Sequence, residues 1–200
     1  MNRRAHRLPL TVLAAAALTL TACSDDNTIN AQMRQGDELG YVAGDGAVEQ
    51  LVPEQRETTI LLEGTTLEDE PWTSADHAGE VLVVNVWGSW CGPCIAEAPD
   101  LEAVASELVE AGEPVQFIGV NVRDSVPSAL AFQEAKGVSY PSLVDDGGRT
   151  LAQLQGLAVA RPTTMLLDGQ GRLAARVNGQ VDAATLRGLI DDVLESEPAA

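Results

Sequence analysis

Cysteine and histidine are scarce in this sequence, which has three cysteines and two histidines in 200 residues. Structural zinc sites take four ligands, usually cysteine and histidine. His6 and Cys23 lie in, or at the end of, an N-terminal stretch with the features of a leader. The remaining candidates are Cys91, Cys94 and His77. This supply argues against a zinc site built by one chain, and we expect neither a metal nor another cofactor.

Basic residues are also few, with 12 Lys and Arg against 30 Asp and Glu and a formal net charge of −18. Residues 1–22 hold three of the basic residues and none of the acidic ones, so the rest of the chain carries −21. So negative a chain is a poor binder of nucleic acid and is repelled by anionic lipid head groups. We expect no nucleic-acid partner, and any attachment to a membrane must come from a lipid or from a protein partner.

The apolar run from Leu8 to Ala22 is short for a membrane span. About 15 residues at about 1.5 Å each reach about 22 Å, against about 30 Å for the hydrocarbon core of a bilayer. Arginines precede the run, and the LTAC segment that ends it at Cys23 resembles a lipoprotein signal box. We predict that residues 1–22 are a lipoprotein signal peptide and that Cys23 carries the lipid. An uncleaved membrane anchor and an ordinary secretory signal are the alternatives.

The next segment, residues 23–56, is polar and contains glycines, without regular apolar periodicity. This composition is typical of a flexible linker. We predict an acidic tether that joins the lipid on Cys23 to one domain at residues 57–200. The alternative is that part of the segment, from Leu39 to Leu51, packs on the domain.

The domain alternates strand-like and helix-like segments. The run VLVVNVW at 81–87 is rich in β-branched residues and is typical of a strand covered on both faces. The order predicts an α/β fold that combines parallel pairing through a crossover with an antiparallel edge, preceded by a hairpin that turns at Glu63-Gly64. The expected strands are 58–63, 66–72, 81–87, 115–122, 142–144, 163–167 and 173–177, and the expected helices are 91–110, 128–136, 149–155 and 182–195.

The sequence Cys91-Gly92-Pro93-Cys94 stands where the buried strand gives way to a helix. A cysteine at a helix start meets the positive end of the helix dipole and unpaired backbone N–H groups, which favour the thiolate. We therefore assign Cys91 as the nucleophile, and Cys94, one turn further and more buried, as the thiol that resolves a mixed disulfide. Pro93 fits the first helical turn, and Gly92 adds no side chain over the sulfur. A static structural disulfide is the alternative.

Glu97 follows Cys94 by one helical turn and lies beside the apolar stripe of the expected helix. Desolvation at this place would raise its pKa toward neutrality. The carboxylate would then take the proton of Cys94 as that thiol attacks, and return it in the reverse step. The alternative is a solvated surface charge.

The motif WGSWCGPC at 87–94, followed by Glu97, Pro99 and Leu101, resembles the TlpA/ResA/DsbE family of membrane-tethered thiol–disulfide oxidoreductases. The resemblance covers about residues 57–195. It implies a thioredoxin-like fold, with a central mixed sheet flanked by helices and an N-terminal β-hairpin extension. The supporting segments are AGEVLVVNVW at 78–87, FIGVNV at 117–122 and RPTTMLLDGQGRL at 161–173.

The resemblance also implies site residues beyond the cysteines. It gives Glu97 the place of an active-site glutamate, whereas the buried aspartate of ordinary thioredoxins falls on Asn85, which cannot titrate. It makes Pro162 a cis-proline that faces the active site, keeps metals from the thiols and lets the nearby backbone pair with an extended substrate. A trans proline that opens a strand is the alternative. The residues expected to contact substrate are Trp90, Gly92, Pro93, Arg161 and Thr163.

Arg161 departs from the family pattern, in which a small or β-branched residue is more usual before the proline. A guanidinium turned toward Cys91 would stabilise the thiolate further and make the disulfide more oxidising. The alternative is an arginine that points outward, to an acidic partner or to solvent.

The resemblance and the Gly-Pro pair between the cysteines predict an extracytoplasmic reductase of disulfides in exported proteins. Reduction is the task that an oxidising compartment does not perform unaided. By resemblance, electrons come from a membrane thiol carrier of the CcdA/DsbD type and apocytochrome c is a candidate client, although the chain has no haem-attachment motif. A disulfide oxidase or isomerase and a non-catalytic client-binding lipoprotein are the alternatives. A peroxidase is disfavoured, because Cys91 and Cys94 both lie in the C-x-x-C.

Overall fold

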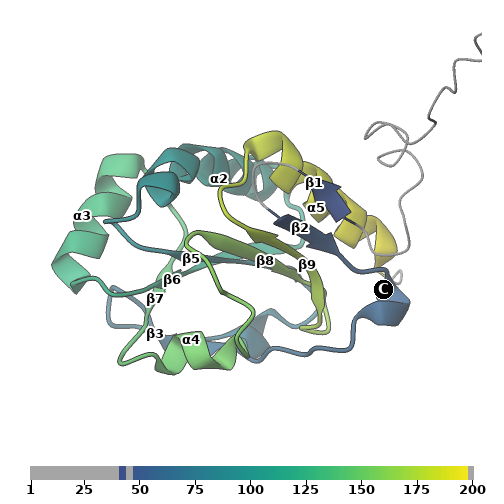
Figure 1. The fold of residues 1–200 in the computed structure, drawn as a ribbon, viewed down its shortest axis with the longest axis horizontal. Coiled ribbons are helices and arrows are strands. Elements are labelled where there is room, and N and C mark those ends of the chain that lie inside the picture. Colours follow the sequence, from purple (N-terminus) through teal and green to yellow (C-terminus); the bar gives the residue numbers. More distant parts are fainter. Residues whose placement is uncertain (1–40, 44–46, 198–200) are drawn as a thin grey trace, which may run out of the picture. The chain divides into compact units, whose positions relative to one another are not determined.

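The computed structural model of the protein describes residues 41–43 and 47–197, with side-chain surroundings from Val48 onward (Figure 1). The predicted signal peptide and Cys23 lie outside the described residues. No helix in the described part of the chain is long and apolar enough to cross a membrane.

A seven-stranded mixed sheet forms the centre of the fold, in the order β1-β2-β9-β8-β5-β6-β7. The pairs β5–β6 and β6–β7 are parallel, and all other neighbours in the sheet are antiparallel. The predicted combination of parallel pairing with an antiparallel edge is therefore confirmed. The strands are β1 (Tyr41–Ala43), β2 (Ala47–Gln50), β5 (Val81–Trp87), β6 (Val115–Asn121), β7 (Ser142–Val144), β8 (Thr163–Leu167) and β9 (Leu173–Asn178).

Helices cover the sheet as the alternating pattern predicts. Figure 1 shows α2 and α5 on one face, and α4 with the two-stranded hairpin β3–β4 on the other. Residues of β5 alternate between the two cores, since Val83 packs with the residues of α2 and α5, and Val84 with those on the opposite face. The helices are α2 (Gly92–Ala111), α3 (Val126–Lys136), α4 (Arg149–Gln153) and α5 (Ala183–Ser196), with short 3-10 turns η1 (Pro53–Gln55) and η2 (Ser74–His77).

The hairpin before the sheet differs from the prediction. Its strands are β3 (Glu63–Thr65) and β4 (Pro71–Thr73), so the chain turns between them rather than at Glu63-Gly64. Ile60 and Leu62 are buried in the core on one face of the sheet. Their burial packs residues 58–62 against the domain, so these residues do not form the predicted first strand of the hairpin. The turn is closed by the Thr66 hydroxyl, which accepts a hydrogen bond from the Glu70 N–H.

The predicted tether is also corrected at its C-terminal end. Strand β2 pairs with β9, and Val48 is buried in the core. The Arg56 guanidinium is buried as well, 3.4 Å from the Asp168 carboxylate and bonded to the Leu51 carbonyl and the Ser196 hydroxyl. A buried charge needs such partners. The alternative, in which part of 39–51 packs on the domain, agrees with the structure.

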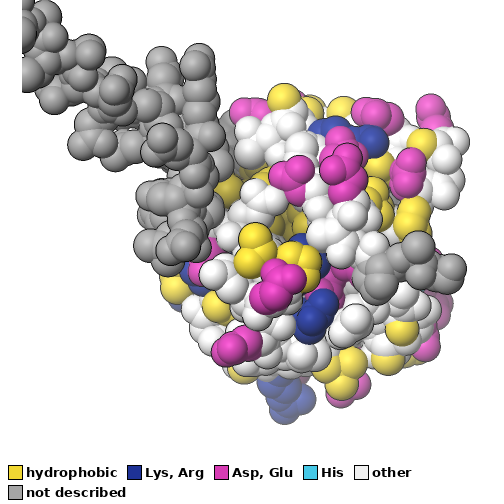
Figure 2. All heavy atoms as spheres, turned by 90° about the vertical axis from the view of Figure 1, so that its right-hand side faces the viewer, with side chains coloured by type: hydrophobic (Ala, Val, Ile, Leu, Met, Phe, Trp, Pro, Cys, Tyr) yellow, Lys and Arg dark blue, Asp and Glu magenta, His cyan; other side chains and the backbone are white. Residues whose placement is uncertain are grey.

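Acidic side chains dominate the side of the domain that carries β2 and α5. Figure 2 looks onto this side and shows many Asp and Glu side chains with few Lys or Arg among them. The surface thus follows the composition, and it offers no basic patch on this side for an anionic partner.

A chain shortened to begin at Glu57 should be less stable than one that begins at residue 36. The chain that begins at Glu57 lacks β2 and Arg56. Asp168 then has one guanidinium as partner, that of Arg172, instead of two. We expect the free energy of unfolding to fall by about 2 kcal/mol or more, measured from urea unfolding at pH 7. Equal stability of the two chains would contradict the assignment of β2 to the sheet.

Candidate active site

The two cysteines of the C-x-x-C motif lie at the start of α2 and form a disulfide. Cys91 is the N-cap of the helix, and its sulfur accepts a hydrogen bond from the Cys94 N–H at 3.3 Å. Cys91 is 6% exposed and Cys94 2% exposed, while Gly92 and Pro93 between them are exposed. The sequence thus predicted correctly which sulfur stands at the helix N-terminus, where a thiolate is favoured.

The loop before Cys91 is held by the turn that follows β6. The Asp124 carboxylate accepts hydrogen bonds from the Ser89 N–H at 2.7 Å and from the Ser89 hydroxyl at 3.0 Å. The Trp90 indole N–H donates to the Val122 carbonyl at 3.2 Å, although the side chain remains 52% exposed. Trp90 is therefore an ordered apolar surface beside the disulfide. Sequence reasoning missed Asp124, because only the fold brings it next to Ser89.

An apolar cluster lies beneath the disulfide. Trp87 stacks on Phe132, with 4.8 Å between ring centroids, and its indole N–H donates to the Ser142 hydroxyl at 3.1 Å. Leu67 and Ala129 complete the buried cluster with both cysteines. This cluster keeps water from the inner side of the disulfide.

Glu97 is fully buried, at 0% exposure, one helical turn beyond Cys94. Its Oε1 accepts a hydrogen bond from the Asn85 side-chain amide at 2.8 Å, and its Oε2 accepts one from the Val181 N–H at 3.1 Å. Burial raises the pKa of Glu97 to about 7, against the opposing effect of these two hydrogen bonds and with a further upward contribution from Asp100. The alternative of a solvated surface charge is wrong.

The peptide bond between Arg161 and Pro162 is cis, as the resemblance implies. Thr163 directly after it pairs with Val86 in the register of β8 and β5, so the proline lies at the end of β5 from which the chain runs to Cys91. The Thr163 side chain is fully buried, and its hydroxyl donates to the Ala160 carbonyl at 3.0 Å. It braces the loop from inside the fold, and the predicted contact of Thr163 with substrate stays a prediction.

Arg161 turns back onto its own loop. Its Nη1 donates to the carbonyls of Ala158 and Ala160, at 2.9 and 2.6 Å. Burial and the neighbouring Arg123 lower the pKa of Arg161, and Asp145 opposes them. Among the described residues these carbonyls are its hydrogen-bond partners, so the guanidinium stabilises the loop before Pro162. The predicted effect of Arg161 on the Cys91 thiolate stays a prediction.

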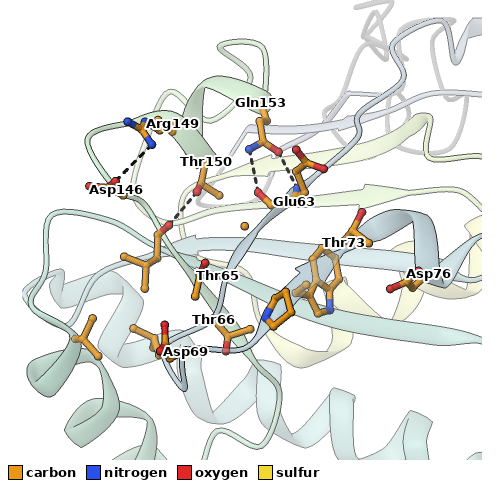
Figure 3. Close-up of a pocket in the computed structure, with 16 residues that line it drawn as sticks. Glu63, Thr65, Thr66, Asp69, Thr73, Asp76, Asp146, Arg149, Thr150 and Gln153 are labelled. Atoms are coloured by element: carbon orange, nitrogen blue, oxygen red, sulfur yellow. Dashed lines mark hydrogen bonds and ion pairs between the residues drawn. The ribbon is translucent and has the colours of Figure 1, made fainter.

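A cavity of about 930 Å³ adjoins the cluster beneath the disulfide, between the β3–β4 hairpin and α4. Leu67 and Val144 line the cavity and also pack in the cluster. Figure 3 shows how Gln153 of α4 bonds the backbone of Glu63 across one side, and how the Thr150 hydroxyl donates to a backbone carbonyl. No pattern in the sequence indicates this cavity, because its walls come from segments far apart in the chain.

Residues 41–43 and 47–197 contain no cluster of three His, Cys, Asp or Glu side chains that could hold a metal ion. The redox-active group that the structure shows at this site is the Cys91–Cys94 disulfide. The chemistry of the site is therefore thiol–disulfide exchange, with a buried carboxyl one turn from the resolving sulfur.

An oxidised Cys-x-x-Cys pair at the start of a helix, on a mixed sheet of this order, defines a thiol–disulfide oxidoreductase with a thioredoxin-like fold. The comparison with known sequences agrees and is more specific. The chain belongs to the AhpC/TSA family, whose sequence profile matches residues 56–176.

Several curated relatives carry the name thiol:disulfide interchange protein, among them HelX and DsbE. HelX of Rhodobacter capsulatus is 32% identical over 127 residues, which are 63% of this chain and 68% of HelX. DsbE of Xylella fastidiosa is 33% identical over 132 residues, 64% of either chain. The chain thus spans about two thirds of the length of these relatives.

Two solved structures are similar over most of their length. A DsbF homologue from Corynebacterium diphtheriae is 35% identical with a TM-score of 0.67, covering 72% of this chain and 92% of that one. A secreted thiol-disulfide isomerase from Corynebacterium glutamicum is 31% identical with a TM-score of 0.69, covering 74% and 92%. These matches confirm the family resemblance and the thioredoxin-like fold.

The buried carboxyl should make the protein less stable as pH rises. The pKa of Glu97 is 4.5 in an unperturbed chain and about 7 in the fold, so between these values the folded protein holds the extra proton. The corresponding stability is fully present below about pH 4.5 and is lost as pH rises through about 7, a change on the order of 3 kcal/mol. Urea unfolding of the oxidised protein at pH 5 and pH 8 should show this loss.

The variant Glu97→Gln is the control for this measurement, because it keeps the shape of the side chain and cannot ionise. It should lack this part of the pH dependence and be more stable than the unsubstituted protein at pH 8. The same pH dependence in both proteins would contradict the burial of an ionisable Glu97.

Proposed function

We propose that this thiol–disulfide oxidoreductase acts outside the cytoplasm as a reductase of disulfides in exported proteins. The observation that carries the proposal is the burial of Glu97 one turn beyond Cys94, with a pKa of about 7. A carboxyl with this pKa gains and loses a proton at physiological pH, as the resolving step needs. The Gly-Pro pair between the cysteines, as in reducing thioredoxins, supports the reductive direction.

The cycle starts from the dithiol. The Cys91 thiolate attacks a client disulfide, forming a mixed disulfide and releasing one client sulfur as thiolate. Glu97 takes the proton of the Cys94 thiol, and the Cys94 thiolate attacks the Cys91 sulfur. The Cys91–Cys94 disulfide forms, the second client sulfur leaves as thiolate, and two electrons have passed to the client. The client thiolates then take up protons, and Glu97 returns its own when the disulfide is reduced again.

The location is supported by the N-terminal sequence and by the comparisons. The run 8–22 and the LTAC box predict export and lipid attachment at Cys23, and the C. glutamicum relative is described as secreted. We propose that the domain is held at the outer side of a membrane by this lipid. The acidic composition leaves the lipid, or a protein partner, as the means of attachment.

The client and the electron donor are proposed from the same resemblance. The chain is similar to proteins named HelX, DsbE and ResA, and apocytochrome c is the client that the resemblance to their family implies. A membrane thiol carrier of the CcdA/DsbD type would return the disulfide to the dithiol. Exposed Trp90, Gly92 and Pro93 surround the disulfide and are the proposed client-contacting surface, with the loop before Pro162 as its second side.

Isomerisation is the second candidate function, because one similar structure is described as a disulfide isomerase. A non-catalytic client-binding lipoprotein is distinguished from both by substitution. Cys91→Ser and Cys94→Ser abolish the activity of an enzyme and leave binding by a pure client binder intact.

The reduction potential of the Cys91–Cys94 pair decides between these directions. For a reductase we expect about −250 mV or below, in the range of thioredoxin. Equilibration of the protein against glutathione or thioredoxin, followed by alkylation of free thiols, gives the value. A potential between about −180 and −120 mV, the range of disulfide isomerase and DsbA, would contradict the reductive assignment.

A further inference from the structure

Asn85 is the one strongly polar side chain in strand β5, whose seven residues are all buried. Its neighbours along the strand are valines and a tryptophan, and it is itself 3% exposed. An amide in such a place costs stability unless each polar atom is bonded. The contacts of Asn85 therefore indicate why the strand carries it.

Both N–H groups of the Asn85 amide have partners. The side-chain nitrogen donates to Oε1 of Glu97 at 2.8 Å and to the Thr164 hydroxyl at 3.1 Å. Thr164 is fully buried in β8 and stands directly opposite Asn85 in the register of the two strands. The amide is thus fixed from the sheet on one side and bonded to the carboxyl of α2 on the other.

We propose that Asn85 is a positioning residue for the reaction, which with Thr164 holds the Glu97 carboxylate in place to accept the proton of Cys94. This inference rests on the proposed role of Glu97. Val181 bonds the other carboxyl oxygen through its backbone N–H, which no side-chain substitution removes directly. Of the two donors to the Glu97 carboxyl, the Asn85 amide is therefore the one that a substitution can remove.

The hydrogen bond from Asn85 also affects the ionisation of Glu97. A donor to a carboxylate favours the ionised form, so the Asn85 amide opposes the upward effect of burial on the pKa of Glu97. Without it, the carboxyl would hold its proton to higher pH and would be a proton acceptor for Cys94 over a narrower pH range. Asn85 thereby extends the reaction toward lower pH.

In the described part of the chain, the other ionisable groups that interact with Glu97 are Asp100 and Tyr140. Asp100, on the same helix, raises the pKa of Glu97. Burial, and then Glu97 and Glu102, raise the pKa of Tyr140, so that phenol stays neutral near pH 7. Cys94 lies on the same helix and titrates only in the reduced protein. An inflection of the rate near pH 7 therefore reports on Glu97 together with Cys94.

The test is the pH profile of the single-turnover reduction of glutathione disulfide by the reduced full-length chain. The disulfide concentration is made high enough that attack by Cys91 is fast and resolution by Cys94 limits the rate, so that ionisation of Cys91 does not shape the profile. Asn85→Leu replaces the amide by an apolar side chain of similar size. We expect the inflection near pH 7 to move up by about one to two pH units, with a rate at pH 6.5 about tenfold or more below that of the unsubstituted protein and little difference at pH 9. A role in folding alone would lower the rate equally at every pH.

Thr164 gives a second, milder test that holds even where Asn85→Leu fails to fold. Thr164→Val keeps the shape and removes the acceptor for Asn85, and should move the inflection up by less than about one unit. Thr164→Ser keeps the hydroxyl and should retain the original profile. Thr150→Val is the matched control, since it removes a buried hydroxyl in α4 that bonds the Val144 carbonyl, and it should leave the profile unchanged.

Glu97→Gln tests the role of Glu97 separately from the role of Asn85. It should remove the inflection, and an inflection that persists in this variant would overturn the role of Glu97 itself. An inflection that is lost in Glu97→Gln but does not move in Asn85→Leu or Thr164→Val would overturn the inference about Asn85 alone.

Discussion

The carboxyl of Glu97 is an acid that the fold encloses completely, and separate parts of the chain meet to hold it. The helix α2 supplies the side chain, β5 supplies the Asn85 amide, and the segment before α5 supplies the Val181 N–H. Removal from water favours the neutral form, and the two donors favour the charged form. Their balance leaves a carboxyl that exchanges a proton near pH 7.

The two sulfurs lie at the start of the same helix, in environments that differ from that of Glu97. Cys91 caps the N-terminus, where backbone N–H groups and the helix dipole favour negative charge, and Cys94 lies one turn inside, above an apolar cluster. The nucleophile is thus activated by the backbone, whereas the resolving thiol depends on a side chain for the removal of its proton. The start of α2 thus places Cys91 at the helix N-terminus and puts Cys94 one turn before Glu97.

Local patterns allowed much of this to be predicted from the sequence. The run 81–87 became β5, the helix began directly after Cys91, and the helical spacing placed Glu97 inside. The rest depends on contacts between distant residues. The sequence of strand β2 has the composition of a linker, yet the strand pairs with β9. The segment after it is fixed by the ion pair of Arg56 with Asp168, which lies 112 residues further along the chain. The Arg161 guanidinium donates a hydrogen bond to a carbonyl of its own loop, and no pattern in the sequence indicates this contact.

The most direct test is a carbon-13 NMR titration of the glutamate side-chain carboxyls in the oxidised protein, with Glu97→Gln to assign the signal. Our account predicts one carboxyl with a pKa of about 7 that is missing from the variant. A Glu97 signal that titrates near the unperturbed pKa of 4.5 would show a solvated carboxyl, and would remove the proton acceptor on which the mechanism depends.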